Sequence, residues 1–257
     1  MEVIKTPYGR YYRTPRGEFP SVNTILSATM PPEKKQALAA WAIKSKEKWH
    51  RDHRKCKNCQ HFQNEKCAIG KKGDRIQTPW KKNRCGGFEM LPLLANSYDP
   101  RTEALSRGTK IHDQIEKVLR GEPWPSAEDF PQGKQIKFFV ENIKPGKLLV
   151  EEALYSAKHC YAGRVDFCGE YQGQMMVLDW TTTARTYIQK DWYADKLTQA
   201  AAYAIAIEET HQVKIDEVLV VVIGPARATL FRDPAKPWKR IWIKRLKEYH
   251  KLTEIPF

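Results

Sequence analysis

The chain lacks any run of about 18 apolar residues, which is the length that a helix needs to cross a membrane. Its first residues, MEVIKTPYGRYYRT, also lack the apolar stretch of a secretory signal. We therefore expect no membrane partner and an intracellular protein, cytoplasmic or nucleoid-associated, of cellular, phage or organellar origin, and not secreted. No internal repeat is visible.

The chain also has few acidic residues relative to basic ones. The 257 residues include 30 Asp and Glu against 44 Lys and Arg, which leaves a formal net charge of +14. Such an excess most often neutralises phosphate, so a polyanion is the first partner to consider. With 41% apolar residues, the chain can fill one good-sized core, alone or with an appendage.

The positive charge is concentrated in one segment. Residues 44–88 hold 14 Lys or Arg and four acids, so this stretch carries +10 and the other 212 residues carry only +4. A charge run is often a solvated face. Here it surrounds a cysteine array, and we expect the segment to be the element that grips nucleic acid.

Four of the six cysteines lie in that segment, as a C-x2-C-x7-C-x17-C array; they are Cys56, Cys59, Cys67 and Cys85. Four thiolates in a reducing compartment favour a metal site over disulfides. Zinc is favoured over an iron–sulfur cluster such as 4Fe-4S, although both accept four thiolates. Without its ion, so small a module should be disordered.

The pattern of apolar residues and turn signals predicts helices and strands in an α/β or α+β arrangement, a mixed sheet flanked by helices. The expected helices are 34–49, 91–119 with a break at Asp99–Pro100, 135–142, 191–210 and 238–252. The expected strands are 8–14, 20–26, 149–156, 161–170, 175–180 and 218–223, with 149–180 as an antiparallel meander.

Two acids occupy strand positions 13 residues apart, Asp166 in GRVD and Asp179 in LDW. A hairpin turn near Gln172–Gly173 would put both on neighbouring strands, where their carboxylates can converge on Mg²⁺ or Mn²⁺. The alternative is two acids at strand ends that face water. A buried acid without such a partner would be costly.

Two further pairs lie four residues apart on predicted helices. His112 and Glu116 form one pair, and Gln199 and Tyr203 form the other. Taken singly, each pair is more often a capping or surface arrangement than a functional site.

The four motifs GTxxH (108–112), GRVD (163–166), VLDWT (177–181) and QxxxY (199–203) follow one another along the chain. In this order they resemble the RecB-like branch of the PD-(D/E)XK nucleases. The segments YAGRVDFCGEYQGQMMVLDWTT (161–182) and PSVNTIL (20–26) look most like the mitochondrial genome maintenance exonuclease group. The resemblance covers residues 18–30 and 104–225. It implies a restriction-endonuclease-like mixed sheet flanked by helices and metal-dependent cleavage of DNA phosphodiesters.

The resemblance also implies roles for single residues. Asp166 and Asp179 would be the principal ligands of Mg²⁺ or Mn²⁺, with His112 as a further ligand or organiser. Gln199 and Tyr203 would position the scissile strand. Glu151 and Glu152, on the preceding strand, are weaker candidates for supporting the ligands.

One position departs from the family pattern. The resemblance calls for a lysine two residues after the second acid, but that residue is Thr181, whose hydroxyl cannot supply the charge. The chain is then an engineered inactive variant, a natural member whose lysine has migrated, or a degenerate protein that binds DNA without cutting it. Lys196 is the first migration candidate and Lys190 the second.

These observations predict a nuclease core in residues 1–50 and 89–257 with a cysteine-ligated basic insertion at 51–88. The expected activity is that of an exonuclease on single-stranded DNA ends, in repair, replication or recombination, with replication or recombination proteins as possible partners. The alternative is a catalytically inactive DNA-binding or recruitment protein on the same fold. Up to two of six tryptophans are expected to stack on unpaired bases; the six are Trp41, Trp49, Trp80, Trp192, Trp238 and Trp242.

Overall fold

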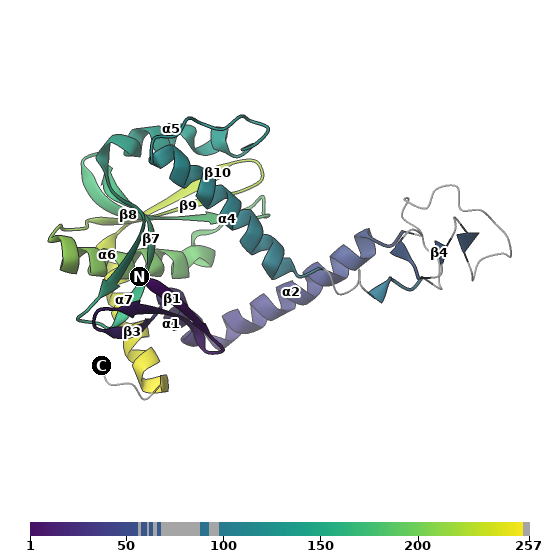
Figure 1. Ribbon diagram of the computed structural model, residues 1–257, viewed down its shortest axis with the longest axis horizontal. Coiled ribbons are helices and arrows are strands. Elements are labelled where there is room, and N and C mark those ends of the chain that lie inside the picture. The colour runs from purple at the N-terminus through teal and green to yellow at the C-terminus, as the bar shows by residue number, and fades with distance from the viewer. Residues whose placement is uncertain (56–57, 61, 64–65, 68–87, 93–97, 254–257) are drawn as a thin grey trace. The chain divides into compact units, whose positions relative to one another are not determined.

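The computed structural model describes residues 1–55, 58–60, 62–63, 66–67, 88–92 and 98–253, with the backbone alone at 62–63 and 66–67. The chain divides into two compact units, unit 1 with residues 1–30 and 107–257, and unit 2 with residues 31–106 (Figure 1). In the described part of the chain, no helix combines the length and the apolar character that a membrane crossing requires.

A five-stranded mixed sheet forms the centre of unit 1, in the order β10-β9-β8-β7-β6. The strands are β6 (Lys147–Ser156), β7 (Tyr161–Tyr171), β8 (Gln174–Thr182), β9 (Glu217–Ile223) and β10 (Ala228–Pro234). All neighbours are antiparallel except β8 and β9, which helix α6 (Ala194–His211) connects as a parallel pair. The expected mixed sheet and the antiparallel meander 149–180 are confirmed.

The turn between β7 and β8 determines the register of these strands. Gln172 and Gly173 both have positive φ, 52° and 75°, and join the paired residues Tyr171 and Gln174. Two residues in the left-handed region make the tight hairpin turn whose twist matches that of the strands. The turn predicted at Gln172–Gly173 is therefore present.

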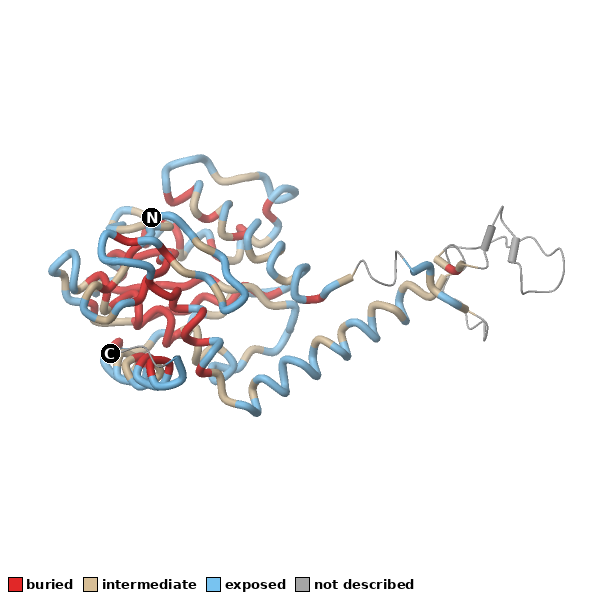
Figure 2. The backbone as a smooth tube through the Cα atoms, turned by 60° about the horizontal axis from the view of Figure 1, so that its bottom comes forward, coloured by how far each residue is buried: buried red, intermediate tan, exposed pale blue. Residues whose placement is uncertain are grey.

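Helices cover both faces of the sheet. On one face, α6, α7 (Ala235–Thr253) and α1 (Val22–Ala28) bury an apolar core that includes the fully enclosed Trp242 and Ile25. On the other face, α4 (Pro100–Leu119) and α5 (Gly133–Ile143) pack against a second core around Trp180. Figure 2 shows most of the buried residues in unit 1. Two 3-10 turns, η2 (Lys144–Gly146) and η3 (Lys190–Tyr193), complete the unit.

The N-terminal segment differs from its prediction. A three-stranded sheet forms from β1 (Glu2–Thr6), β2 (Gly9–Thr14) and β3 (Gly17–Pro20), and residues 22–28 are the helix α1. The expectation of a strand over 20–26 is wrong, because Ser21 caps a helix there: its Oγ accepts the Thr24 N–H at 3.0 Å. Strands β1 and β10 were not expected, since each lies at a sheet edge and neither contains a buried residue.

Unit 2 begins with α2 (Pro32–Asp52), which matches the predicted helix over 34–49 and has no buried residue. Two short strands, β4 (Phe62–Gln63) and β5 (Lys66–Cys67), pair antiparallel. The predicted break at Asp99–Pro100 is the start of α4, where the Asp99 carboxylate accepts the Arg101 N–H at 2.9 Å. Unit 2 contains the expected insertion 51–88, whose own boundaries stay a prediction.

Candidate metal site of unit 1

Three acids meet at one level of three neighbouring strands. The register Phe167–Leu178 between β7 and β8, continued by one residue, puts Asp166 opposite Asp179. The register between β6 and β7 puts Glu151 opposite Asp166, between the pairs Val150–Phe167 and Glu152–Val165. Directly opposite residues lie about 5 Å apart, so the three carboxylates converge from β6, β7 and β8.

His112 reaches these acids from α4. Its Nδ1 lies 3.5 Å from Asp166 Oδ2 and 3.6 Å from Glu151 Oε1. One ligand atom each from His112, Glu151 and Asp166 lies within 4.8 Å of the others. A Cβ on Gly108 would be 3.7 Å from Thr182 Oγ1, which shows how closely α4 passes the end of β8.

Burial gives the acids unusual proton affinities. Asp166 and Asp179 are 8% and 1% exposed. Burial raises the pKa of Asp179 to about 6, although the Lys196 ammonium acts to lower it. Burial likewise raises the pKa of Asp166, against the lowering effect of His112. Charged carboxylates at this site therefore need cationic partners.

His112 and Lys196 are those partners in the described part of the chain. Burial alone would lower the pKa of His112, but a hydrogen bond to Glu151 and the charge of Asp166 outweigh it and raise the pKa to about 9. Burial would also lower the pKa of Lys196, but the charges of Asp179 and Asp166 hold it above its usual value. Without a metal ion both groups therefore favour their charged forms at neutral pH, and His112 has to lose its proton before its ring nitrogen can bind a metal ion.

Lys196 contacts the second acid directly. It lies in the first turn of α6, and its Nζ is 3.0 Å from Asp179 Oδ2 and donates to Gln199 Oε1 at 3.1 Å. Gln199 Nε2 in turn donates to the Tyr203 hydroxyl at 3.2 Å. Spacings of three and four residues on one helix place the three side chains in a row. Gln199 and Tyr203 are 5% and 3% exposed.

Gly163 makes room for this row on the strand side. A Cβ at that position would lie 2.5 Å from Tyr203 Cε1, closer than any van der Waals contact allows. The glycine of the GRVD motif therefore lets the Tyr203 ring lie against β7. Burial raises the pKa of Tyr203 well above its usual value, so its hydroxyl stays protonated.

Other predicted residues have different surroundings. Lys190 Nζ pairs with Asp233 at 2.6 Å instead of Asp179. Glu116 pairs with Arg120 at 2.9 Å and with Arg164 at 3.7 Å. Glu152 is exposed. Thr181 pairs with Val222 of β9 and is half-buried, two residues beyond Asp179 on β8.

Glu151 is closer to the centre of the site than its sequence position indicated. Its φ is +50°, in the left-handed region that a residue with a side chain adopts only under constraint. Arg164 Nε holds it in place, 2.9 Å from Glu151 Oε2 and 2.9 Å from Glu151 O. A count of the four turn residues 157–160 would have placed Glu151 opposite Asp166, had the ends of β6 and β7 been known.

The residues fit a small divalent cation. Carboxylate oxygens and one imidazole nitrogen are donors that suit Mg²⁺ or Mn²⁺. Asp179 Oδ2 is buried and accepts no hydrogen bond of good geometry, even though Lys196 Nζ is its ion-pair partner. An oxygen of this kind has a lone pair available for a cation. The fold and the site thus define a sheet-based carboxylate–histidine site that can bind a metal ion.

The cysteine array lies mostly outside the described residues. Cys56 and Cys85 are not described, and of Cys67 only the backbone is. Cys59 is buried, forms no disulfide and pairs its backbone with Met90. The metal site proposed for the four cysteines therefore stays a prediction. Cys160 is exposed and Cys168 is buried.

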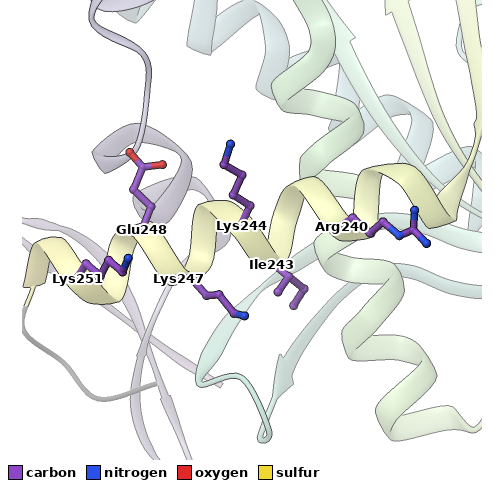
Figure 3. Close-up of a pocket in the computed structure, with 6 residues that line it drawn as sticks. All are labelled: Arg240, Ile243, Lys244, Lys247, Glu248 and Lys251. Atoms are coloured by element: carbon purple, nitrogen blue, oxygen red, sulfur yellow. The ribbon is translucent and has the colours of Figure 1, made fainter.

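A separate hollow of about 530 Å³ lies along α7 (Figure 3). Its lining is mainly basic and consists of Arg240, Ile243, Lys244, Lys247, Glu248 and Lys251. In Figure 3, Lys244 and Glu248 point to one side of the helix, and Ile243 and Lys247 point to the other. Helix α7 is thus a second basic element, apart from residues 44–88.

Comparison with known proteins gives one curated relative. The chain is 29% identical over 181 residues to mitochondrial genome maintenance exonuclease 1 of Xenopus tropicalis, which covers 64% of this chain and 51% of that protein. The chain thus spans about half the length of the curated relative that it matches. No family model matches it.

Two solved structures are similar over part of the chain. One is the crystal structure of SSO0001, with 13% identity, a TM-score of 0.33, and coverage of 60% of this chain and 64% of that one. The other is a candidate exonuclease from Eubacterium rectale, with 10% identity, a TM-score of 0.41, and coverage of 63% and 70%.

Proposed function

We propose that this protein is a metal-dependent DNA exonuclease that hydrolyses phosphodiester bonds at the ends of single-stranded DNA. The observation that carries the proposal is the convergence of Glu151, Asp166, Asp179 and His112, with Lys196 on Asp179. The curated relative is named as an exonuclease, and its similarity spans 64% of this chain. The net charge of +14 agrees with a polyanionic substrate.

In this proposal the carboxylates of Asp166 and Asp179, with Glu151 and His112, hold one or two Mg²⁺ or Mn²⁺ ions. A bound divalent ion polarises the phosphate, lowers the pKa of water and neutralises charge on the leaving oxygen. The chain's own residues supply the rest. Arg164 keeps the Glu151 carboxylate turned toward His112, since it contacts both the carboxylate and the carbonyl of Glu151.

Lys196 takes the part of the lysine that is absent at position 181. Its ammonium is a cation next to Asp179, where it can orient an attacking water and stabilise negative charge that develops on the phosphate. Gln199 fixes this ammonium through its Oε1, and Tyr203 fixes the amide of Gln199. Gln199 and Tyr203 act on the scissile strand through Lys196 in this account, because both side chains are buried.

A nuclease assay tests the proposal. A labelled single-stranded oligonucleotide should be shortened in the presence of Mn²⁺ or Mg²⁺ and stay intact with EDTA. The Lys196→Ala substitution should lower kcat by about 100- to 1,000-fold, the loss typical of one preorganised cationic or hydrogen-bonding group. Lys214→Ala is the matched control, because Lys214 is exposed and pairs only locally with Asp216.

The Thr181→Lys variant separates the accounts of the missing lysine. If Lys196 is the functional lysine, Thr181→Lys changes the rate of the wild-type chain little and restores part of the activity of Lys196→Ala. Intact DNA with the wild-type chain, together with cleavage by Thr181→Lys, would instead exclude a migrated lysine and leave the engineered inactive variant and the degenerate DNA-binding protein. A salt-sensitive mobility shift with intact DNA would identify that binder.

We also infer that Cys56, Cys59, Cys67 and Cys85 bind one structural metal ion, zinc before an iron–sulfur cluster. A colourless protein that releases about one zinc per chain would support zinc. Absorbance near about 400 nm would identify an iron–sulfur cluster instead. If the purified chain contains neither zinc nor an iron–sulfur cluster and all four thiols react freely, the proposed metal site is wrong.

A further inference from the structure

An exposed aromatic cluster lies on the segment that connects Asp179 to Lys196. This segment leaves β8 after Thr182 and enters α6 through η3. Tyr187 is 62% exposed and Trp192 is 40% exposed. Their rings meet edge to face with centroids 6.0 Å apart, and the Arg185 guanidinium lies 4.4 Å from the centroid of the Trp192 ring.

Contacts with the rest of unit 1 hold the segment that carries the cluster. The backbone N–H of Thr183 donates to Ile223 O at 3.0 Å, and Lys190 Nζ pairs with Asp233 at 2.6 Å. Ile188, within the same segment, packs against the apolar core. The Gln189 amide donates to the Tyr187 hydroxyl at 3.1 Å. Large aromatic side chains are thus held at the surface by a segment whose ends are fixed in the fold.

The chemistry of the cluster suits a flat, uncharged, unpaired ring system. Exposed aromatic rings and an arginine plane bind nucleobases by stacking, which needs no particular sequence because every base has a π face. A base inside a duplex has both faces covered by its neighbours, whereas every base of an unpaired strand can offer a face to such a surface. Because the segment already holds these side chains in place, less conformational entropy is lost when a ligand binds.

The position of the cluster agrees with this chemistry. Trp192 precedes Lys196 by four residues, and Arg185 follows Asp179 by six. The cluster thus lies on the connection between two residues of the candidate site. We propose that Arg185, Tyr187 and Trp192 form a stacking platform for unpaired bases of the substrate strand. This inference rests on the proposed function and assigns the single-strand preference to a particular surface.

A binding measurement without catalysis tests the platform. Fluorescence anisotropy in EDTA compares a labelled oligothymidine with a strand of equal length made of abasic residues. Trp192→Ala should weaken binding of oligothymidine about tenfold, the usual loss for one stacked base, and leave binding of the abasic strand unchanged. Trp192→Phe should retain most of the affinity.

Phe138→Ala is the matched control, because Phe138 is an aromatic residue of α5 that is 78% exposed. It should bind both strands like the wild-type chain. Should Trp192→Ala unfold, Trp192→Phe and Arg185→Ala carry the test, and Arg185→Ala should also act on oligothymidine more than on the abasic strand.

Two results would overturn the platform. One is an equal loss of affinity for both strands, which would mean a phosphate contact or a structural role. The other is unchanged binding of oligothymidine by Trp192→Ala. Failure of the proposed function gives a different signature, namely no cleavage of single-stranded DNA by the wild-type chain with Mn²⁺, whatever the anisotropy shows.

Discussion

Glu151 shows most clearly how the surroundings constrain a single residue of the candidate site. Glu151 keeps a φ of +50° and directs its carboxylate to His112 and Arg164. Strain of this kind persists only where the surroundings hold it, and it is concentrated at functional sites. These contacts make Glu151 a candidate metal ligand, whereas its neighbour Glu152 is exposed.

Glu151→Gln tests that place. The amide keeps the size of the side chain but loses the charge, so the affinity for Mn²⁺ should fall by about 10- to 100-fold. Isothermal titration of the metal-free protein with Mn²⁺ measures the change directly. Glu152→Gln is the control, since Glu152 is exposed. Equal affinities in both variants would remove Glu151 from the metal site.

The two cysteines of unit 1, Cys160 and Cys168, should differ in reactivity. Burial raises the pKa of the Cys168 thiol to about 12, so near pH 8 almost all of it is the unreactive protonated form. Cys160 is exposed. Iodoacetamide at about pH 8, followed by peptide mass spectrometry, should modify Cys160 and leave Cys168 unmodified until the protein unfolds. Equal labelling of both in the native protein would contradict this prediction.

At the scale of elements, the site depends on how α4 and α6 pack against the sheet. Helix α4 carries His112 to one side of the three acids, and α6 brings Lys196 to Asp179. Glycine permits the closest approach on the α6 side, where the Tyr203 ring lies against Gly163. The packing of the Tyr203 ring against Gly163 thus helps to position Lys196, Gln199 and Tyr203 of α6 relative to β7.

Gly163→Ala should disturb this packing. Its Cβ would lie 2.5 Å from Tyr203 Cε1, so either the ring or β7 must move. Overpacking of a core typically costs about 1–3 kcal/mol, and urea unfolding followed by circular dichroism measures it. Activity should fall as well, because Tyr203 holds Gln199.

Gly108→Ala is the matched control for that substitution. Its Cβ would meet Thr182 Oγ1 at 3.7 Å, an ordinary contact, and alanine favours a helix by up to about 1 kcal/mol over glycine. The free energy of unfolding should therefore stay the same or rise. If Gly108→Ala lowers the free energy of unfolding as much as Gly163→Ala does, the contact with Tyr203 is not the cause of the destabilisation.

At the scale of the whole molecule, most of the net positive charge and the candidate metal site lie in different parts of the chain. Residues 44–88 carry +10, whereas the remaining 212 residues, which contain all the site residues of unit 1, carry +4. A strong local excess of positive charge supplies affinity for phosphates without sequence preference. The insertion at 51–88 is therefore expected to contribute binding, and unit 1 to contribute hydrolysis.

Neutralising charge in the insertion tests this division. Replacement of Lys71, Lys72, Lys81 and Lys82 by glutamine should weaken binding of single-stranded DNA and flatten its dependence on salt, with a slope change of up to about 0.7 for each lost phosphate contact. Maximal hydrolysis at saturating DNA should stay unchanged. Anisotropy at several salt concentrations measures the slope, and an unchanged slope would exclude the insertion as the gripping element.

Part of the candidate site can be predicted from the sequence. The 13-residue gap between Asp166 and Asp179, together with the turn at Gln172–Gly173, predicts their register, and the paired strands confirm it. A two-residue turn allows only one register for the hairpin, so counting residues from the turn is enough to pair Asp166 with Asp179. The spacing of Gln199 and Tyr203 on a helix is predictable in the same way.

Other features needed the tertiary structure. Glu151 and Lys196 come from elements whose approach to Asp166 and Asp179 depends on the strand pairing of β6 and on the packing of α6. The helix at 22–28 depends on a cap at Ser21 that outweighs the strand propensity of its apolar residues. Short-range spacing determines local register, while contacts between distant elements decide which lysine meets Asp179, because only packing in three dimensions brings their charges together.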